Sequence, residues 1–346
     1  MAAIAPDATG VAATLAPAPR EPEDNKPPSM YDLIRAMKAL KNEDVVLQWR
    51  PEACGMVLLV FSEKGGVGKT ALTNAIATVM AYAGKKVLVI DLDPRATATS
   101  ELGIAIDKDD FGVNDILYVD PEDPEPADPT GSAAEVAISA NADNDWPQNI
   151  HVLPSSRLLG NREKDNTPGI ERRLQQSLVG VKEQYDLVIV DVPPRAGGTL
   201  VAAAVLAGTH AIFPATMNED GFDGVTDAMT SIRRTRSSTG MPPLKIVGII
   251  RNIVDPSRKN SAIEYDGHFR EAWPADSTDR CTTCQKDDIA HCDHILRLIE
   301  DLLIPEYDLR VQARNKCVPF MLATGKEAEW LRRAYTLLAN RISEAA

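Results

Sequence analysis

The chain has 346 residues, of which 44% are hydrophobic and 25% charged, and its formal net charge is −13. This composition is typical of a globular protein and excludes a surface coated with positive charge. The longest apolar runs are too short to span a bilayer, and the N-terminus lacks the basic start and apolar block of a secretory signal. Five cysteines in so long a chain do not suggest a disulfide framework, and they favour a reducing cytoplasm.

The N-terminal part is expected to contain a tail and then a helix. Residues 1–28 are rich in Ala, Pro and Asp and hold few large apolar side chains, which predicts a disordered tail. Ser29 can cap a helix, and residues 29–50 are interpreted as this helix and a linker. Apolar residues recur there at helical spacing: Met30, Leu33, Ile34, Met37 and Leu40.

Residues 51–346 are predicted to form one α/β domain. Short apolar runs read as buried parallel strands at 56–61, 86–91, 151–154, 186–192, 210–215, 245–250 and 302–306. Helical stretches rich in Ala and Leu lie between most of them, and one is expected to stop near Gly84. This alternation predicts a mostly parallel sheet with helices on both faces.

Three further segments complete the expected organisation of the domain. Residues of about 119–149 are rich in Asp, Pro and Ala and are interpreted as a surface insertion. A Cys/His-rich insertion is expected at about 273–295. A final helix over about 325–343 carries an apolar stripe that indicates packing against the core rather than attachment to a membrane.

A phosphate-binding loop follows the first expected strand and opens the next helix, which is the context this motif requires. Glycines allow backbone N–H groups to approach phosphates, and the helix N-terminus adds partial positive charge. Lys69 is expected to neutralise the outer phosphates, and the Thr70 hydroxyl can bind Mg²⁺. The expected nucleotide-binding residues of the loop are Gly65, Gly66, Val67, Gly68, Lys69, Thr70 and Ala71.

Carboxylates end two of the expected strands near this loop. Asp191 follows four apolar residues and is expected to support Mg²⁺, directly or through water. Asp91 ends the strand at 86–91, and Asp93 lies just beyond it. A carboxylate at this place can orient an attacking water, although Asp93 could also be a turn residue before Pro94.

With Lys64 included, the loop reads K-G-G-V-G-K-T and resembles the deviant Walker A motif of the ParA/MinD ATPases, which are P-loop NTPases. The resemblance covers about 56–118, 150–256 and 300–342. Similar stretches are VLVIDLDPRATATSELG, FGVNDIL, HVLPSSRLL, YDLVIVDVPP, HAIFPATMNEDGFDGV and LIPEYDLRVQARNK. The spread and order of these matches make the resemblance specific.

The resemblance implies a role for each matched residue. Lys64 would reach across a homodimer to the partner's ATP, as a cation that is delivered only when the dimer closes. Asp93 would orient the attacking water, and Asp91 and Asp191 would lie near the Mg²⁺ shell. Asn252 sits where relatives often contact adenine.

Two arginines depart from the family pattern. Arg95 stands where many relatives have Gln, and Arg195 stands where many have Ser after two prolines. Both add positive charge near the expected nucleotide, so the resemblance does not fix the hydrolysis rate or the dimer geometry.

The Cys/His-rich insertion has the spacing of a zinc site. The expected ligands are Cys281, Cys284, Cys292 and His294, with His291 as the alternative fourth ligand. A reduced polar loop without metal and an iron–sulfur cluster are the other interpretations.

Basic residues gather in the last forty residues, although the net charge of residues 1–230 is strongly negative. In ParA relatives this part of the fold binds nonspecific DNA after ATP-driven dimerisation, and such phosphate contacts need no base reading. A solvated basic face is the alternative. The candidate DNA-binding residues are Arg310, Arg314, Lys316, Lys326, Arg332 and Arg333.

The resemblance therefore implies a cytoplasmic, nucleoid-associated ATPase. It would form an ATP-dependent sandwich dimer and segregate a plasmid or chromosome, or position another cargo. Slow hydrolysis would be stimulated by a ParB-like or other cargo-bound adaptor. A MinD-like membrane-positioning ATPase, a metal-cluster carrier and a non-hydrolysing scaffold are the alternatives.

Overall fold

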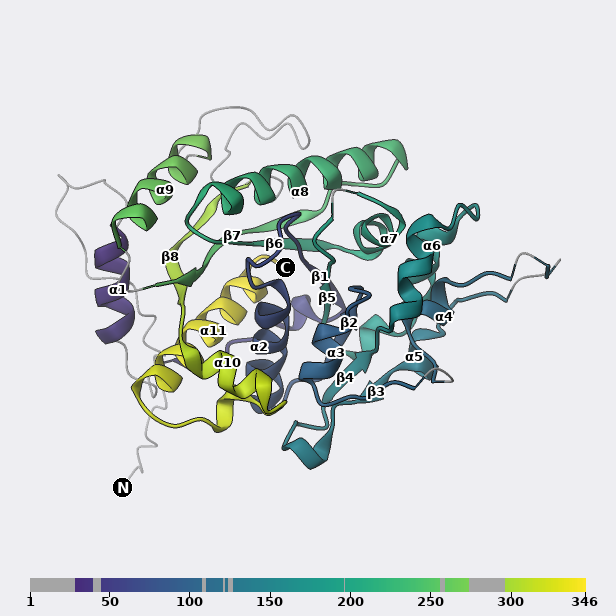
Figure 1. Cartoon of the computed structure of the whole chain (residues 1–346), viewed down its shortest axis with the longest axis horizontal. Helices are drawn as coiled ribbons and strands as arrows, with labels where there is room; N and C mark the ends of the chain where they lie inside the picture. Colours follow the sequence, from purple (N-terminus) through teal and green to yellow (C-terminus); the bar gives the residue numbers. More distant parts are fainter. Residues whose placement is uncertain are drawn as a thin grey trace, which may run out of the picture.

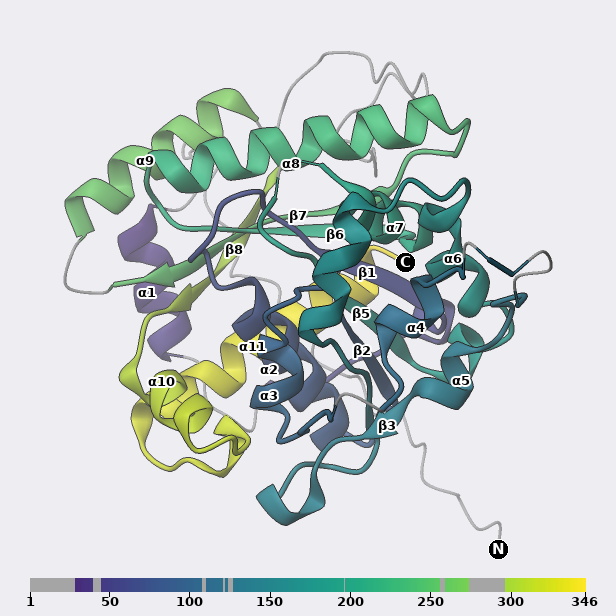
Figure 2. The same cartoon turned by 45° about the vertical axis from the view of Figure 1, so that its right-hand side comes forward.

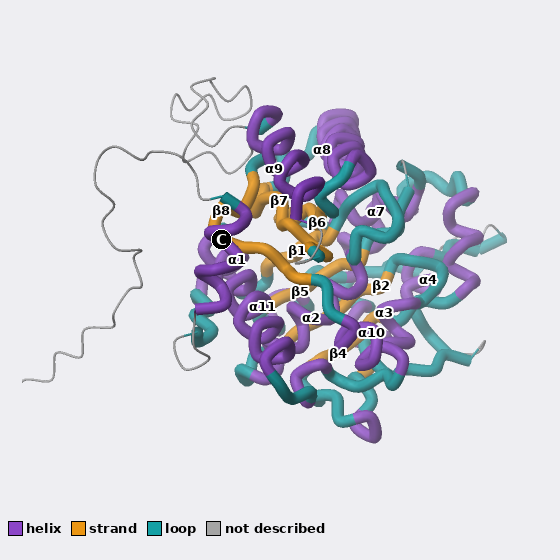
Figure 3. The backbone as a smooth tube through the Cα atoms, turned by 60° about the vertical axis from the view of Figure 1, so that its left-hand side comes forward, coloured by secondary structure: helices purple, strands orange, loops and turns teal. Residues whose placement is uncertain are grey.

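The computed structural model describes residues 29–39, 45–107, 110–120, 122–123, 127–195, 197–255, 259–273 and 296–346. In these residues eight strands form one sheet in the order β3-β4-β2-β5-β1-β6-β7-β8. Helices lie on both sides of the strands, as Figure 3 shows in purple and orange. The mostly parallel α/β fold expected from the sequence is thus confirmed.

Every strand pair in the sheet is parallel except the pair of β3 with β4. The strands are β1 (Met56–Val60), β2 (Val87–Asp91), β3 (Ile138–Ser139), β4 (Ile150–Leu153), β5 (Leu187–Asp191), β6 (His210–Ala215), β7 (Lys245–Val254) and β8 (Leu298–Pro305). All residues of β1, β2, β5 and β6 are buried. Their continuous apolar sequences follow from burial on both faces.

The register of the central strands brings the site residues together at the carboxyl ends of β1, β2 and β5. Asp91 at the end of β2 lies opposite Asp191 at the end of β5, and Asp191 lies opposite Val60 at the end of β1. Because parallel strands end on the same side, both carboxylates lie at the end of the sheet where the loop after β1 begins.

Helices cover the sheet in two layers (Figures 1 and 2). On one side, α2 (Lys69–Tyr82) packs on β1, β2 and β5, and α11 (Lys326–Glu344) packs on α2 and β8. On the other side, α7 (Thr199–Ala207) packs on β1 and α8 (Glu219–Ser238) on β6. The apolar stripe of α11 is buried, as the sequence indicates.

The remaining helices extend these layers. They are α1 (Met30–Ala39), α3 (Thr97–Glu101), α4 (Val113–Leu117), α5 (Ala133–Val136), α6 (Ile170–Ser177), α9 (Lys259–Ala272) and α10 (Asp308–Asn315). Short 3-10 helices are η2 (Pro51–Ala53), η3 (Ala142–Asn144), η4 (Arg157–Lys164), η5 (Lys182–Gln184) and η7 (Phe320–Leu322). In the described part of the chain, no helix is both long and apolar enough to cross a membrane.

Three features differ in detail from the sequence prediction. Strands β7 and β8 are longer than the runs at 245–250 and 302–306, and β3 lies within the segment interpreted as an insertion. That segment also buries Trp146, whose indole N–H donates to the Cys317 carbonyl at 2.7 Å. The segment therefore adds an antiparallel edge strand and contacts the C-terminal part of the domain.

Candidate nucleotide-binding site

The loop between β1 and α2 is open above its glycines. A Cβ atom built at Gly65 or Gly66 would meet no atom within 4 Å, so their backbone faces free space. Gly68 has a φ of +82°, and a Cβ there would lie 2.5 Å from Asn252 Nδ2. Only glycine fits both constraints at this position, so the last turn of the loop depends on it.

Lys69 is a buried cation aimed back at this loop. Lys69 is the first residue of α2. Its ammonium donates to the backbone carbonyls of Ser62 and Lys64, each at 2.9 Å. Burial lowers the pKa of Lys69 to about 8, although the nearby Asp191 and Asp93 carboxylates act in the opposite direction. An anion at the loop would relieve the cost of holding this charge away from water.

Thr70 and Asp191, both expected near Mg²⁺, lie in direct contact. The Thr70 hydroxyl donates to Asp191 Oδ2 at 2.6 Å. Asp191 is 1% exposed, and its Oδ1 is buried without a hydrogen-bond partner among the described atoms. Burial, together with the charge of Asp91, raises the pKa of Asp191 well above its ordinary value. A cation beside these two side chains would satisfy the free oxygen and favour the charged carboxylate.

The Asp91 carboxylate is hydrogen-bonded to residues of the turn and helix that follow β2. Its Oδ2 accepts from the Thr99 backbone N–H at 2.9 Å and from the Thr99 hydroxyl at 2.8 Å, and its Oδ1 accepts from the Asp93 N–H at 3.1 Å. Burial raises the pKa of Asp91 to about 6, while these hydrogen bonds lower it. Asp91 therefore positions the turn that carries Asp93.

Asp93 is paired with Arg95. The Arg95 Nε lies 3.2 Å and 3.1 Å from the two carboxylate oxygens of Asp93, and a terminal nitrogen lies 2.7 Å from Oδ2. The Arg95 N–H donates to Asp93 Oδ1 at 3.0 Å. Burial raises the pKa of Asp93, but the hydrogen bonds and charge of Arg95 outweigh it, so the pKa lies below its ordinary value.

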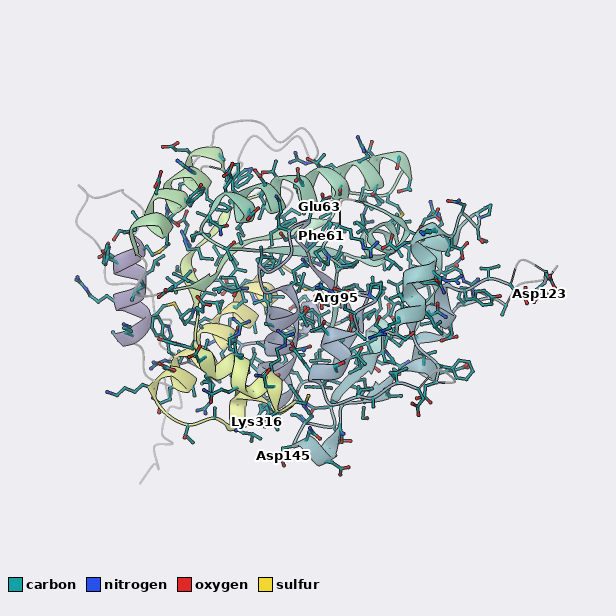
Figure 4. The ribbon with its side chains drawn as sticks, viewed as in Figure 1. Phe61, Glu63, Arg95, Asp123, Asp145 and Lys316 are labelled. Atoms are coloured by element: carbon teal, nitrogen blue, oxygen red, sulfur yellow. The ribbon has the colours of Figure 1, made fainter. Side chains whose placement is uncertain are left out.

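A cavity of about 370 Å³ joins these groups. Its walls come from the loop, from α2, from the turn after β2, and from the segment that follows β8 through α10. Lining residues include Gly66, Lys69, Thr70, Asp93, Arg95, Asp191, Tyr307, Arg310 and Arg314. In the view of Figure 4, Arg95 lies near the middle of the picture. The lining is mixed in chemistry, because it includes the charged and hydroxyl side chains of Lys69 and Thr70 as well as the aromatic side chains of Trp146 and Phe320.

Lys64 lies on the α8 side of the loop. Its ammonium is 3.2 Å from Asp220 Oδ1 at the start of α8, and both side chains are solvent-exposed. The neighbouring Glu63 accepts from the Ser231 hydroxyl of α8, beneath which Figure 4 places it. Lys64 is therefore not directed at the cavity of its own chain.

Asn252 contacts the loop backbone. Its Nδ2 donates to the Val67 carbonyl at 2.8 Å, and its buried Oδ1 has no partner among the described atoms. The next residue, Ile253, lines the cavity. Contact of Asn252 with a base stays a prediction.

The expected basic group of the C-terminal part divides in space. Arg310 lies over the Tyr335 ring at 5.6 Å, and Arg314 Nε is 2.9 Å from Glu101 Oε1. Both line the cavity, whereas Arg332 donates to the Ala323 carbonyl and Lys316 is exposed near α10 (Figure 4). The structure thus brings Arg310 and Arg314 to the candidate site and leaves Lys316 free to face solvent.

The expected zinc ligands at residues 281–294 lie outside the described residues, so the zinc site stays a prediction. Among the residues that are described, no group of three or more His, Cys, Asp or Glu side chains is arranged to hold a metal ion. Mg²⁺ needs no such group, since it keeps several waters and binds one or two protein oxygens beside a phosphate.

Three contacts of the site were not predicted from the sequence. They are the pairing of Arg95 with Asp93, the hydrogen bonds of Thr99 to Asp91, and the ion pair of Glu101 with Arg314. The i, i+2 spacing of Asp93 and Arg95 around Pro94 was the available signal, because such a turn places two side chains together.

Comparison with known proteins identifies the family of the chain. A family model described as an AAA domain matches residues 55–245. The sporulation initiation inhibitor protein Soj of Bacillus subtilis (strain 168) is 30% identical over 212 residues, which cover 61% of this chain and 77% of that relative. The chromosome partitioning protein ParA of Caulobacter vibrioides (strain NA1000 / CB15N) is 29% identical over 212 residues, which cover 60% of this chain and 72% of ParA.

A solved structure shares the fold. The ATP complex of McdA from Cyanothece superposes with a TM-score of 0.62 at 20% identity, over 84% of this chain and 95% of that one. The chain belongs to this AAA-domain family and, within it, to the ParA/MinD-type P-loop ATPases.

Proposed function

We propose that the protein is a ParA-type ATPase that binds ATP and Mg²⁺ in the cavity beside α2 and works as an ATP-controlled dimer. The observation that carries the proposal is the convergence of Lys69, Thr70, Asp191 and Asp93 on one cavity below a glycine loop. Family membership supports the same reaction class.

The residues of the site fit the ligands. The open backbone at Gly65 and Gly66 leaves room for phosphate oxygens, and the buried Lys69 supplies a cation that is hydrogen-bonded to two backbone carbonyls. Thr70 and the free Oδ1 of Asp191 would hold Mg²⁺, which neutralises phosphate charge when bound. Asp93 would orient the attacking water by accepting its hydrogen bond.

The second lysine supports a dimer. Lys64 faces Asp220 and solvent rather than the cavity of its own chain. Two nucleotides facing one another across a dimer would repel, and one cation from each subunit would offset that repulsion only after closure. In this proposal Lys64 exchanges Asp220 for the phosphates of the other subunit's nucleotide, so ATP controls dimerisation.

The dimer would bind nonspecific DNA and respond to a ParB-like or other cargo-bound adaptor in the cytoplasm, at the nucleoid. The exposed Lys316 supports a phosphate contact, and Arg332 and Arg333 lie on the neighbouring α11. Arg310 and Arg314 contribute to the cavity, so we assign the DNA contact mainly to the other basic residues. The cargo would be a plasmid, a chromosome or another large assembly.

A membrane-positioning role receives less support. The apolar residues of α11 are already packed against α2 and β8, so this helix has no free apolar stripe for a bilayer. The metal-cluster carrier alternative depends on residues 281–294 and awaits a measurement of metal content in the purified protein.

DNA retention tests the proposal. The protein is passed over immobilised nonspecific DNA with ATP–Mg²⁺, with ADP–Mg²⁺ and without nucleotide, at low and high salt. We expect retention only with ATP, and we expect it to fall steeply as salt rises. Phosphate release in the same samples reports hydrolysis. If the protein binds ATP but is not retained on DNA, the proposed DNA binding is wrong. If it does not bind ATP, the whole proposed function is wrong.

A further inference from the structure

The pairing of Arg95 with Asp93 affects the chemistry expected of Asp93. Three short contacts join the guanidinium to the carboxylate, at 2.7 to 3.2 Å. Both carboxylate oxygens are engaged, and a fourth contact comes from the Arg95 backbone. A carboxylate held by a two-pronged guanidinium has few lone pairs left for water.

The other surroundings of Asp93 fix its position without occupying its oxygens. The Ser155 hydroxyl, two residues after the end of β4, donates to the Asp93 backbone carbonyl at 2.7 Å. Asp91 accepts from the Asp93 N–H at 3.1 Å. The Asp93 side chain is 8% exposed, whereas that of Arg95 is 70% exposed. Hydrogen bonds therefore fix the backbone of Asp93. Its carboxylate is covered by the Arg95 side chain, which is exposed and can move into solvent.

We propose that Arg95 is a latch on Asp93, which holds ATP hydrolysis slow by occupying the carboxylate that would orient the attacking water. The inference rests on the proposed ATPase function and adds a positioning residue to it. Because Arg95 lines the cavity but does not belong to the glycine loop, its loss should change the hydrolysis step and leave nucleotide binding intact.

The latch has a defined chemical consequence. When the guanidinium moves away, the Asp93 oxygens become free to accept a hydrogen bond from water, and no covalent change in the protein is required. Movement costs little, because an ion pair with one exposed partner is weak. An anionic group that binds the exposed guanidinium, such as a carboxylate of a partner protein, would release the latch.

The test is steady-state phosphate release by the full chain at saturating ATP–Mg²⁺, compared among variants. For Arg95→Gln we expect kcat to rise about two- to fivefold, the effect of a weak ion pair, with KM unchanged. Arg95→Lys keeps the charge but loses the two-pronged contact, so it should also raise kcat, by less. The gain must disappear when Arg95→Gln is combined with Asp93→Asn.

Arg195→Gln is the matched control. The sequence led us to expect Arg195 near the nucleotide, but in the structure its exposed side chain lies 3.8 Å from Glu163 and does not line the cavity. The substitution therefore removes the same charge away from the site. We expect its kcat to equal that of the unmodified protein. A kcat of Arg95→Gln equal to or below that of the unmodified protein would overturn the latch. If neither the unmodified protein nor any variant binds ATP, the proposed function fails instead.

Discussion

Replacement of Lys69 by methionine is expected to stabilise the nucleotide-free protein and to abolish its response to ATP. Lys69 is 7% exposed, and burial lowers its pKa from an ordinary 10.5 to about 8. That difference corresponds to about 3 kcal/mol, since one pKa unit is worth about 1.4 kcal/mol. Methionine has a similar length and carries no charge, so it avoids this cost. The two carbonyls that Lys69 contacts lose their donor, which makes 3 kcal/mol an upper value.

The effect has a defined pH dependence. Between about pH 8 and 10.5 the unfolded chain keeps the Lys69 proton and the folded chain has lost it, so the stability of the unmodified protein rises with pH. Below pH 8 both states hold the proton, and the full cost is present. The advantage of Lys69→Met should therefore be complete at pH 7 and smaller at pH 9.5.

Urea unfolding at these two pH values measures the difference, with and without ATP–Mg²⁺. A ligand at a hundred times its Kd adds about 2.7 kcal/mol to the unmodified protein, and the variant should gain nothing. Lys64→Met is the control, because Lys64 is exposed and its removal should leave the midpoint nearly unchanged. A variant less stable than the unmodified protein at pH 7, or an advantage that grows toward pH 9.5, would refute the reasoning.

Further substitutions distinguish effects on stability from effects on ligand binding. Gly68→Ala should destabilise the protein by about 1–3 kcal/mol, because φ at this position is +82° and the new Cβ would contact Asn252. Gly65→Ala should leave the urea midpoint unchanged, because a Cβ there meets no atom within 4 Å. Asp191→Asn should weaken ATP binding only when Mg²⁺ is present, as titration calorimetry with and without EDTA would detect. Because burial raises the pKa of Asp191, the unmodified protein should lose stability as pH rises above about 4, and Asp191→Asn should lose less. Equal slopes with pH in the two proteins would contradict that assignment.

The part of the site that the sequence predicts is the part built by strand ends and a short motif. Asp191 and Thr70 could both be placed near the phosphate loop, because Asp191 ends a strand and Thr70 lies in the first turn of the helix after the loop; their 2.6 Å contact is a finding of the structure. The glycine loop is similarly local, since backbone conformation and spacing define it. The central strands could be located because strands that are buried on both faces are continuous apolar runs in the sequence.

Other contacts depend on side-chain direction or on distant packing. Arg310 and Arg314 form part of a basic run in sequence, yet α10 turns both toward the cavity while Lys316 faces solvent. Trp146 reaches the same cavity from a segment that looks like a plain surface insertion. No periodicity encodes these directions, because they follow from how α10 packs against η7 and how β3 pairs with β4.

Solution mass tests the central claim most directly. Asp93→Asn should hold ATP without hydrolysing it, and light scattering with ATP–Mg²⁺ should then give twice the 37.5 kDa of one chain. The double variant Asp93→Asn/Lys64→Ala should bind ATP with similar affinity and remain at the mass of one chain. A monomeric Asp93→Asn variant with ATP bound, or a double variant that still dimerises with ATP, would contradict the account.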